Sequence, residues 1–224
     1  MQNSAHVAMS SALVGDRLWL DFVNTDSATV GASPGRVRRG PRSDVLDAFT
    51  PFLLWMQTAG ALDGERVTAI LRRAEQQPVG AAAVLAEARG LRAALRGLAE
   101  RGGAAVGDRS RDEAVVEINR VLGRSTGTRR LDLRGDGGFV RTFAPVGDAF
   151  AGLMIPVAES AADSFVTGEL ARVRRCAGSR CGRVFYDGTK NRRRRWCEMS
   201  ICGNRAKASR HRARRRSGTT SPRG

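Results

Sequence analysis

The sequence lacks long apolar runs and has little histidine. Apolar segments such as 51–56 fall far short of the roughly 20 residues that cross a bilayer, so we expect no membrane partner. Residues 1–15 have neither a basic start nor a long apolar stretch, which predicts a cytoplasmic protein without a secretory signal. The two histidines, His6 and His211, lie outside the central part of the chain, and histidine is the commonest general base. No Gly-rich phosphate loop or nucleophile elbow occurs, so we predict that the chain is not an enzyme.

Cysteine and lysine are absent from most of the chain. The four cysteines all fall between residues 176 and 202, and the lysines are Lys190 and Lys207. Disulfides are rare in the reducing cytoplasm, so the cysteines are interpreted as thiols or metal ligands.

Positive charge is concentrated in the last quarter of the sequence. The whole chain has a formal net charge of +16. Residues 1–169 contain 20 arginines and 20 acidic residues, whereas residues 170–224 contain 18 basic residues against Asp187 and Glu198. This asymmetry predicts two modules with different partners, of which the second faces a polyanion. A basic disordered tail is the alternative.

The hydrophobic pattern predicts a fold that is mainly α with a small β element (α+β). The clearest helix, about 81–101, carries an apolar stripe that must be buried: Val84, Ala88, Leu91, Leu95 and Leu98. Other helices are expected from Thr50-Pro51 to about Gly60 and over about 64–76, 111–122 (Val115, Ile118 and Leu122 on one face) and 148–172. Pro156 should kink or break the last of these.

Two further segments suggest extended structure. Alternating apolar residues in 17–25 predict a short strand or a tight apolar turn. Apolar residues on both sides of Gly135–Gly138 predict a β-hairpin over about 129–143. We therefore expect a helical domain over 1–170, a small cysteine module over 171–216 and a disordered tail over 217–224.

The cysteine spacing is the most specific signal. Cys176-x4-Cys181 and Cys197-x4-Cys202 form two close pairs separated by 15 residues. Each pair closes a small loop that directs two sulfurs inward, as a tetrahedral zinc ion requires, and a segment with so few apolar groups needs such a staple to fold. Four unrelated thiols and an iron–sulfur cluster are the alternatives.

The residues that follow the last cysteine predict a basic helix. As a helix, 204–216 would place Asn204, Lys207, His211 and Arg215 on one face. Arginine and asparagine are well shaped to contact guanine and adenine edges, and phosphate contact would relieve the repulsion between the cations. A second cluster, Lys190 to Arg195, is expected to contact phosphates from the loop between the cysteine pairs. The candidate nucleic-acid-binding residues are Arg192, Arg193, Arg194, Arg195, Asn204, Arg205, Lys207, Arg210, His211, Arg212, Arg214, Arg215 and Arg216.

Two stretches of the sequence resemble known bacterial families. Arg195-Trp196-Cys197, the run Cys202-Gly203-Asn204-Arg205-Ala206-Lys207 and the basic tail at 211–212 resemble the CGNR zinc finger over about 172–216. Leu20-Asp21-Phe22-Val23-Asn24-Thr25 is similar to the early signature of the ABATE domain, which usually precedes that finger.

The resemblance implies a stress-induced transcription regulator with a ligand-sensing body and a finger that binds DNA. By this resemblance Cys176, Cys181, Cys197 and Cys202 hold Zn²⁺. Asn204 caps the helix, fixes the metal loop or contacts DNA. Trp196 is interpreted as a core residue, with a base-stacking platform as the alternative. Asp21 and Asn24 are expected either to line a ligand pocket or to form structural hydrogen bonds to a nearby helix end.

Three other functions also fit the sequence. They are an RNA-binding or ribosome-associated protein, an enzyme acting on a small molecule through Asp21 and Asn24, and a protein-interaction finger. The leading interpretation is a nucleoid-associated, zinc-dependent DNA-binding regulator with a small-molecule effector. A homodimer would enlarge the limited contact area of one small finger.

Overall fold

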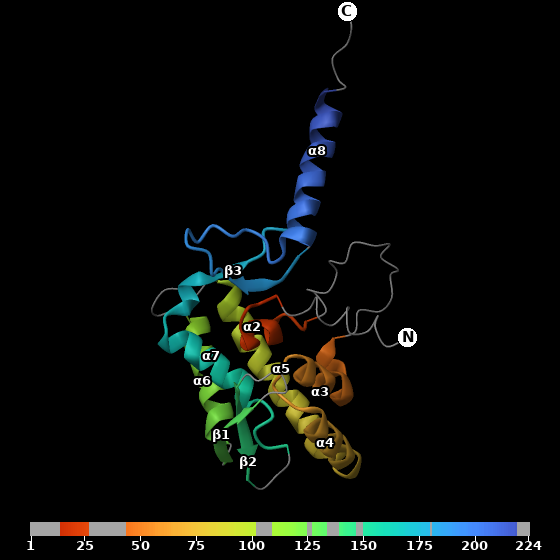
Figure 1. Cartoon of the computed structure of the whole chain (residues 1–224), viewed down its shortest axis with the longest axis vertical. Helices are drawn as coiled ribbons and strands as arrows, with labels where there is room; N and C mark the ends of the chain where they lie inside the picture. Colours follow the sequence, from red (N-terminus) through yellow and green to blue (C-terminus); the bar gives the residue numbers. More distant parts are fainter. Residues whose placement is uncertain are drawn as a thin grey trace, which may run out of the picture.

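The computed structural model describes residues 14–26, 44–101, 109–124, 127–133, 139–146, 150–179 and 181–218. Most of these residues are helical, and the strands form two small antiparallel pairs (Figure 1). We call residues 14–170 the body and residues 171–218 the finger. The elements of the body are α2 (Leu18–Val23), η2 (Val45–Asp47), α3 (Phe49–Thr58), α4 (Gly64–Gln76), α5 (Pro78–Glu100), α6 (Arg109–Gly123), β1 (Gly127–Leu133), β2 (Phe139–Pro145), α7 (Ile155–Val166) and η3 (Glu169–Arg172, which extends into the finger).

The long helix α5 is the centre of the body. Its predicted stripe is buried along its whole length, from Val84 to Leu98. Pro78 opens the helix, where a missing amide hydrogen costs nothing. Helices α2, α3, α4 and α6 all pack against α5, which explains why its stripe is so regular.

The segment predicted to be a strand or a turn is the helix α2. Trp19, Leu20, Phe22 and Val23 are all fully buried, so apolar residues surround the helix rather than marking one face. The prediction was wrong because a fully buried segment carries no periodic signal that separates a helix from a strand.

Other boundaries also differ from the predictions. Helix α3 begins at Phe49, and its N-cap, Ala48, makes no side-chain capping bond, so Thr50 is not the cap. The helix predicted over 148–172 is shorter: α7 begins only at Ile155, with Pro156 in its first turn, so the proline limits the helix on this side as the predicted break allowed. On α6 the face is shifted by one residue: Ala114, Ile118 and Val121 are buried while Val115 is exposed.

The predicted hairpin is present as β1 and β2. The strands pair antiparallel from Gly127 opposite Pro145 to Leu133 opposite Phe139. Phe143 from β2 reaches the core of the body. The glycines predicted to form its turn lie outside the described residues.

The finger packs directly on the body. Its strands β3 (Val173–Arg175) and β4 (Val184–Tyr186) pair antiparallel. Val173 and Val184 belong to the core of the body, whereas Phe185 packs against the four cysteines. Successive side chains of a strand point to opposite faces, so β4 separates the two cores.

The chain ends in a projecting helix. The turn η4 (Met199–Gly203) leads into α8 (Asn204–Gly218), which extends away from the rest of the molecule (Figure 1). The predicted tail begins at 217, but α8 continues to Gly218, and residues 219–224 lie outside the described residues. Among the described residues, no helix has the length and apolar character required to span a membrane.

Candidate metal centre and nucleic-acid interface

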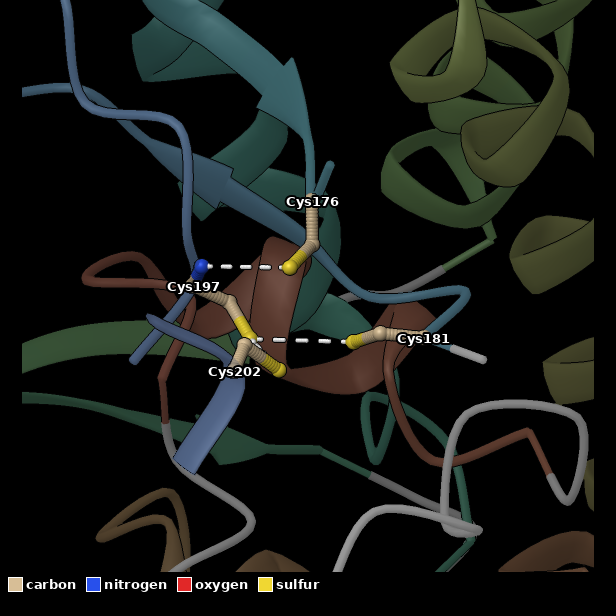
Figure 2. Close-up of side chains that lie close together, drawn as sticks. All are labelled: Cys176, Cys181, Cys197 and Cys202. Atoms are coloured by element: carbon tan, nitrogen blue, oxygen red, sulfur yellow. Dashed lines mark hydrogen bonds between the residues drawn. The ribbon is translucent and has the colours of Figure 1, made fainter. Parts of the chain in front are cut away.

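The two cysteine pairs meet in one buried cluster. The sulfurs of Cys176, Cys181, Cys197 and Cys202 all lie within 4.8 Å of one another, and their side chains converge (Figure 2). Cys197 Sγ lies 3.7 Å from Cys181 Sγ and 3.7 Å from Cys202 Sγ. Four sulfurs at about 2.3 Å from a tetrahedral zinc ion would be about 3.8 Å apart. The donor atoms therefore fit one metal ion of this size.

Backbone hydrogen bonds hold the cysteine loops in place. The amide of Cys176 donates to the carbonyl of Arg183 at 2.9 Å, and the amide of Ala177 donates to the carbonyl of Arg195 at 2.9 Å. The amide of Cys197 donates to the sulfur of Cys176 at 3.4 Å (Figure 2). Both cysteine pairs are thus connected through the backbone as well as through their sulfurs.

Gly178 allows the first loop to pass close to the cluster. A Cβ atom at this position would lie 3.1 Å from Cys181 Cβ and 3.6 Å from the sulfurs of Cys176 and Cys202. A larger residue would therefore require Cys181 to shift by a few tenths of an ångström.

The electrostatics of the cluster favour a bound cation. Hydrogen bonds from Cys181 and Cys197 lower the pKa of the Cys176 thiol. The hydrogen bonds with Cys176 and Cys181, together with burial, raise the pKa of Cys197. Burial and the neighbouring charges of Cys181 and Cys176 raise the pKa of Cys202 to about 12. A divalent metal would offset two of the four negative charges that the sulfurs carry when all four are deprotonated.

Arg194 fixes the segment that enters the second cysteine pair. Its guanidinium lies 4.7 Å from the centre of the Phe185 ring and donates to the carbonyls of Trp196 at 3.1 Å and Cys197 at 2.5 Å. It also pairs with Asp16 of the body at 2.9 Å. The sequence predicted a phosphate contact for Arg194, which stays a prediction; the structure shows that the same guanidinium holds the segment in place.

Asp187 organises the same loop. The Asp187 side chain is fully buried, and burial alone would raise its pKa. Hydrogen bonds from Thr189 and from the amide of Arg194, together with the charge of Arg174, hold the pKa of Asp187 below its ordinary value. The Asp187 carboxylate accepts the Arg194 amide at 2.9 Å and lies 3.3 Å from Arg174 Nε. The loop therefore presents Arg192, Arg193 and Arg195 to solvent in a defined conformation.

Helix α8 is exposed over most of its length. Every residue from Lys207 to Arg215 is exposed, including Arg210, His211, Arg212 and Arg214. The side chain of Asn204 donates to the carbonyl of Ser200 at 2.9 Å, so it fixes the turn η4 to the first turn of α8. Arg216 belongs to α8, and its side chain lies outside what the structure describes.

A groove lies between the first turns of α8 and the metal loops. Its volume is about 470 Å³. It brings together Arg195, from the loop, with Arg205, Arg210 and Arg212, from the helix. Trp196 is half-buried against the cysteine cluster, as its core role predicts, and it also lines this groove. The groove could not be predicted from the sequence, because it depends on the angle at which α8 leaves the cluster.

The body contacts the finger through its early signature residues. The side-chain amide of Asn24 pairs with both backbone groups of Val184, at 2.8 and 2.9 Å. The buried Asp21 carboxylate accepts the amide of Gly15 at 2.7 Å. Both residues form structural hydrogen bonds, but their partners are the strand β4 and Gly15 rather than the helix end that the sequence analysis suggested.

Burial raises the pKa of Asp21 to about 6, although hydrogen bonds from the backbone of Gly15 and Val14 act in the opposite direction.

Gly15 also connects the body to the finger, because its carbonyl accepts the amide of Tyr186 at 3.0 Å. A Cβ atom at Gly15 would lie 2.8 Å from the backbone nitrogen of Asp21, so only glycine fits there.

Two arginines at this boundary were not identified from the sequence. Arg96 of α5 donates to the carbonyls of Val23 at 2.6 Å and Gly182 at 3.1 Å. Arg17 forms a two-bond ion pair with Glu169, and its guanidinium lies 4.2 Å from the centre of the Tyr186 ring. In a chain with so many arginines, nothing in the sequence distinguishes these two.

A four-thiolate metal centre beside an exposed basic helix defines a metal-binding regulatory protein, and two family models agree. The CGNR zinc finger matches residues 172–215. The ABATE model, described as "Putative stress-induced transcription regulator", matches residues 16–169. The chain belongs to the ABATE family. No curated protein matches it.

Proposed function

We propose that this chain is a zinc-dependent, DNA-binding transcription regulator. The observation that carries the proposal is the position of α8, a basic helix that begins two residues after Cys202 and projects away from the molecule (Figure 1). The metal would fix the start of this helix, and the residues from Lys207 to Arg215 are exposed to a partner. The family is described as a regulator rather than an enzyme.

The sulfur separations favour zinc over an iron–sulfur cluster. An iron–sulfur cluster spreads its four thiolates over two or four irons, which requires more space than four sulfurs within 4.8 Å of one another enclose. Zinc also suits four thiolates because it needs no redox partner. Zinc would supply structural charge compensation here, with all four positions taken by protein.

The dimensions and charge of α8 suit duplex DNA. Its 15 residues span roughly 22 Å, and the major groove of B-DNA accepts an α-helix. Seven of those residues are basic and none is acidic, while residues 1–169 are neutral overall. Attraction to a polyanion therefore comes from the finger, and the exposed side chains of Lys207 and His211 would lie near base edges.

A cavity in the body suits a small-molecule effector better than the region of Asp21 and Asn24. Its volume is about 490 Å³, and Arg17, Ser160, Asp163 and Glu169 are among its lining residues. Since Arg17 also contacts Tyr186 of the finger, a polar ligand that competes for Glu169 would alter the body–finger contact. Filling the cavity with Ser160→Trp should abolish ligand-induced changes in DNA affinity without changing the affinity of the free protein.

The body at 1–170 and the finger at 171–216 would then have separate roles in a nucleoid-associated regulator. We propose a homodimer on DNA, because one finger of this size buries less area than specific sites require. The apparent mass of the complex on a selected duplex tests this point.

Selection of binding sites from random duplexes, in excess competitor RNA, tests the DNA assignment. A preferred duplex that survives the competitor supports the proposal. If competitor RNA displaces the protein from every duplex equally, the protein binds RNA rather than a specific DNA site. Affinity that is independent of salt would indicate a protein-interaction finger, because phosphate contacts give a log–log slope of about −0.9 each.

A further inference from the structure

We propose that the groove at the base of α8 binds one backbone phosphate of the DNA and so fixes the position of the helix on the duplex. This inference rests on the proposed DNA-binding function and adds a specific subsite to it. The groove is lined by arginines from two separate segments of the chain: Arg195 precedes the second cysteine pair, and Arg205 and Arg210 follow it.

The chemistry of the groove indicates an anion. Four arginines line it together with Ser179 and Ser209, and none of the described lining residues is acidic. Arginine presents several N–H groups in a planar fork that matches phosphate oxygens two at a time. Two such forks on opposite walls would bind one phosphate from both sides.

Trp196 adds an apolar surface next to the cations. The Arg195 guanidinium lies 5.3 Å from the centre of the Trp196 ring. This contact restrains the arginine beside another residue of the groove, since a cation over an aromatic face is held there. The volume of about 470 Å³ is in the range that holds a small organic molecule. It therefore accommodates a phosphate together with its sugar, which would pack on the indole.

The cysteine cluster connects both walls of the groove. Gly178 lies two residues after Cys176, Trp196 directly precedes Cys197, and Arg205 lies three residues after Cys202. A phosphate held between these walls would lie at a fixed distance from the metal centre. The rest of α8 would then enter the duplex from one defined point.

A double-mutant cycle on a selected duplex tests whether Arg195 and Arg205 bind the same phosphate. We expect Arg195→Gln and Arg205→Gln each to weaken binding by roughly tenfold or more. The double variant should lose clearly less than the product of the two losses, because the second change removes a partner from a phosphate already released. Its salt slope should fall by about 0.9, the value for one phosphate.

The matched control pairs Arg195→Gln with Arg214→Gln. Arg214 lies nine residues beyond Arg205, or about 13 Å along the helix, so the two losses should multiply. Ethylation of single phosphates should identify one position that blocks the wild-type protein but not the Arg195→Gln/Arg205→Gln variant.

Metal content equal to wild type in every variant shows that the fold is kept. Multiplicative losses for Arg195 and Arg205, with a slope change of about 1.8, would overturn the single-phosphate groove while leaving DNA binding intact. A wild-type protein that binds no duplex would overturn the proposed function itself.

Discussion

The side-chain amide of Asn24 forms two hydrogen bonds with the backbone of Val184, as the backbone of a neighbouring strand would. It donates to the Val184 carbonyl at 2.8 Å and accepts from the Val184 amide at 2.9 Å. Both backbone groups belong to β4, which carries Phe185 into the cysteine cluster. The early signature of the body is therefore a connection to the finger.

We predict that Asn24→Ala destabilises the finger on the body by about 2 kcal/mol, because two buried backbone groups lose their partners. Faster hydrogen exchange at the Val184 amide and a lower unfolding midpoint would show this. Asn191→Ala is the control, since Asn191 is exposed and accepts a 3.3 Å bond from the Arg193 amide. Equal effects of the two changes would contradict a role for Asn24 at this contact.

Asp21 should make stability depend on pH. Its carboxyl has a pKa of about 6 in the folded state against 3.8 ordinarily, so the folded state binds the proton more tightly. The tighter proton binding of Asp21 contributes its full stabilisation of the folded state below about pH 4, and this stabilisation is lost as the pH rises through 6. Relative to wild type, Asp21→Asn should therefore gain on the order of 3 kcal/mol between pH 4 and pH 7. Denaturant unfolding of both proteins at each pH measures this difference, and a constant difference would refute the shift.

Arg194 should act as a positioning residue for the metal. We expect Arg194→Gln to weaken zinc affinity roughly 10- to 100-fold, because groups that orient metal ligands have effects of this size. Arg193→Gln removes the same charge from an exposed neighbour and should leave zinc affinity unchanged. Competition with a chelator measures both variants. If Arg194→Gln and Arg193→Gln bind zinc equally tightly, the contacts of Arg194 with Trp196 and Cys197 are not needed to position the metal ligands.

Removing one thiolate should unfold the finger. We predict that Cys197→Ser loses the metal and the helical signal of α8, because three remaining sulfurs cannot close the site. The body should also lose stability, since Val184 belongs to its core. Metal analysis and circular dichroism report the two effects. A folded variant with a full metal content would show that Cys197 is not a ligand.

The sequence predicted most strongly those features that depend on local pattern. The stripe from Val84 to Leu98 and the span of α4 were confirmed, because periodicity and capping are read along the chain. The grouping of four cysteines was confirmed for the same reason, since the spacing itself describes two closed loops.

Features that depend on tertiary packing could not be predicted. Helix α2 resembled a strand because all of its sides are buried. Arg194 resembled its exposed neighbours because its contacts with Asp16 and Phe185 come from distant segments. The groove beside Trp196 required the relative positions of two loops and a helix, which no local pattern contains.

Zinc titration of the metal-free protein, with duplex affinity measured at each point, tests most directly whether a metal holds α8 ready for DNA. We predict that affinity for a selected duplex rises with bound zinc and saturates at one ion per chain. Unchanged affinity in the metal-free protein, with α8 still helical, would contradict the account.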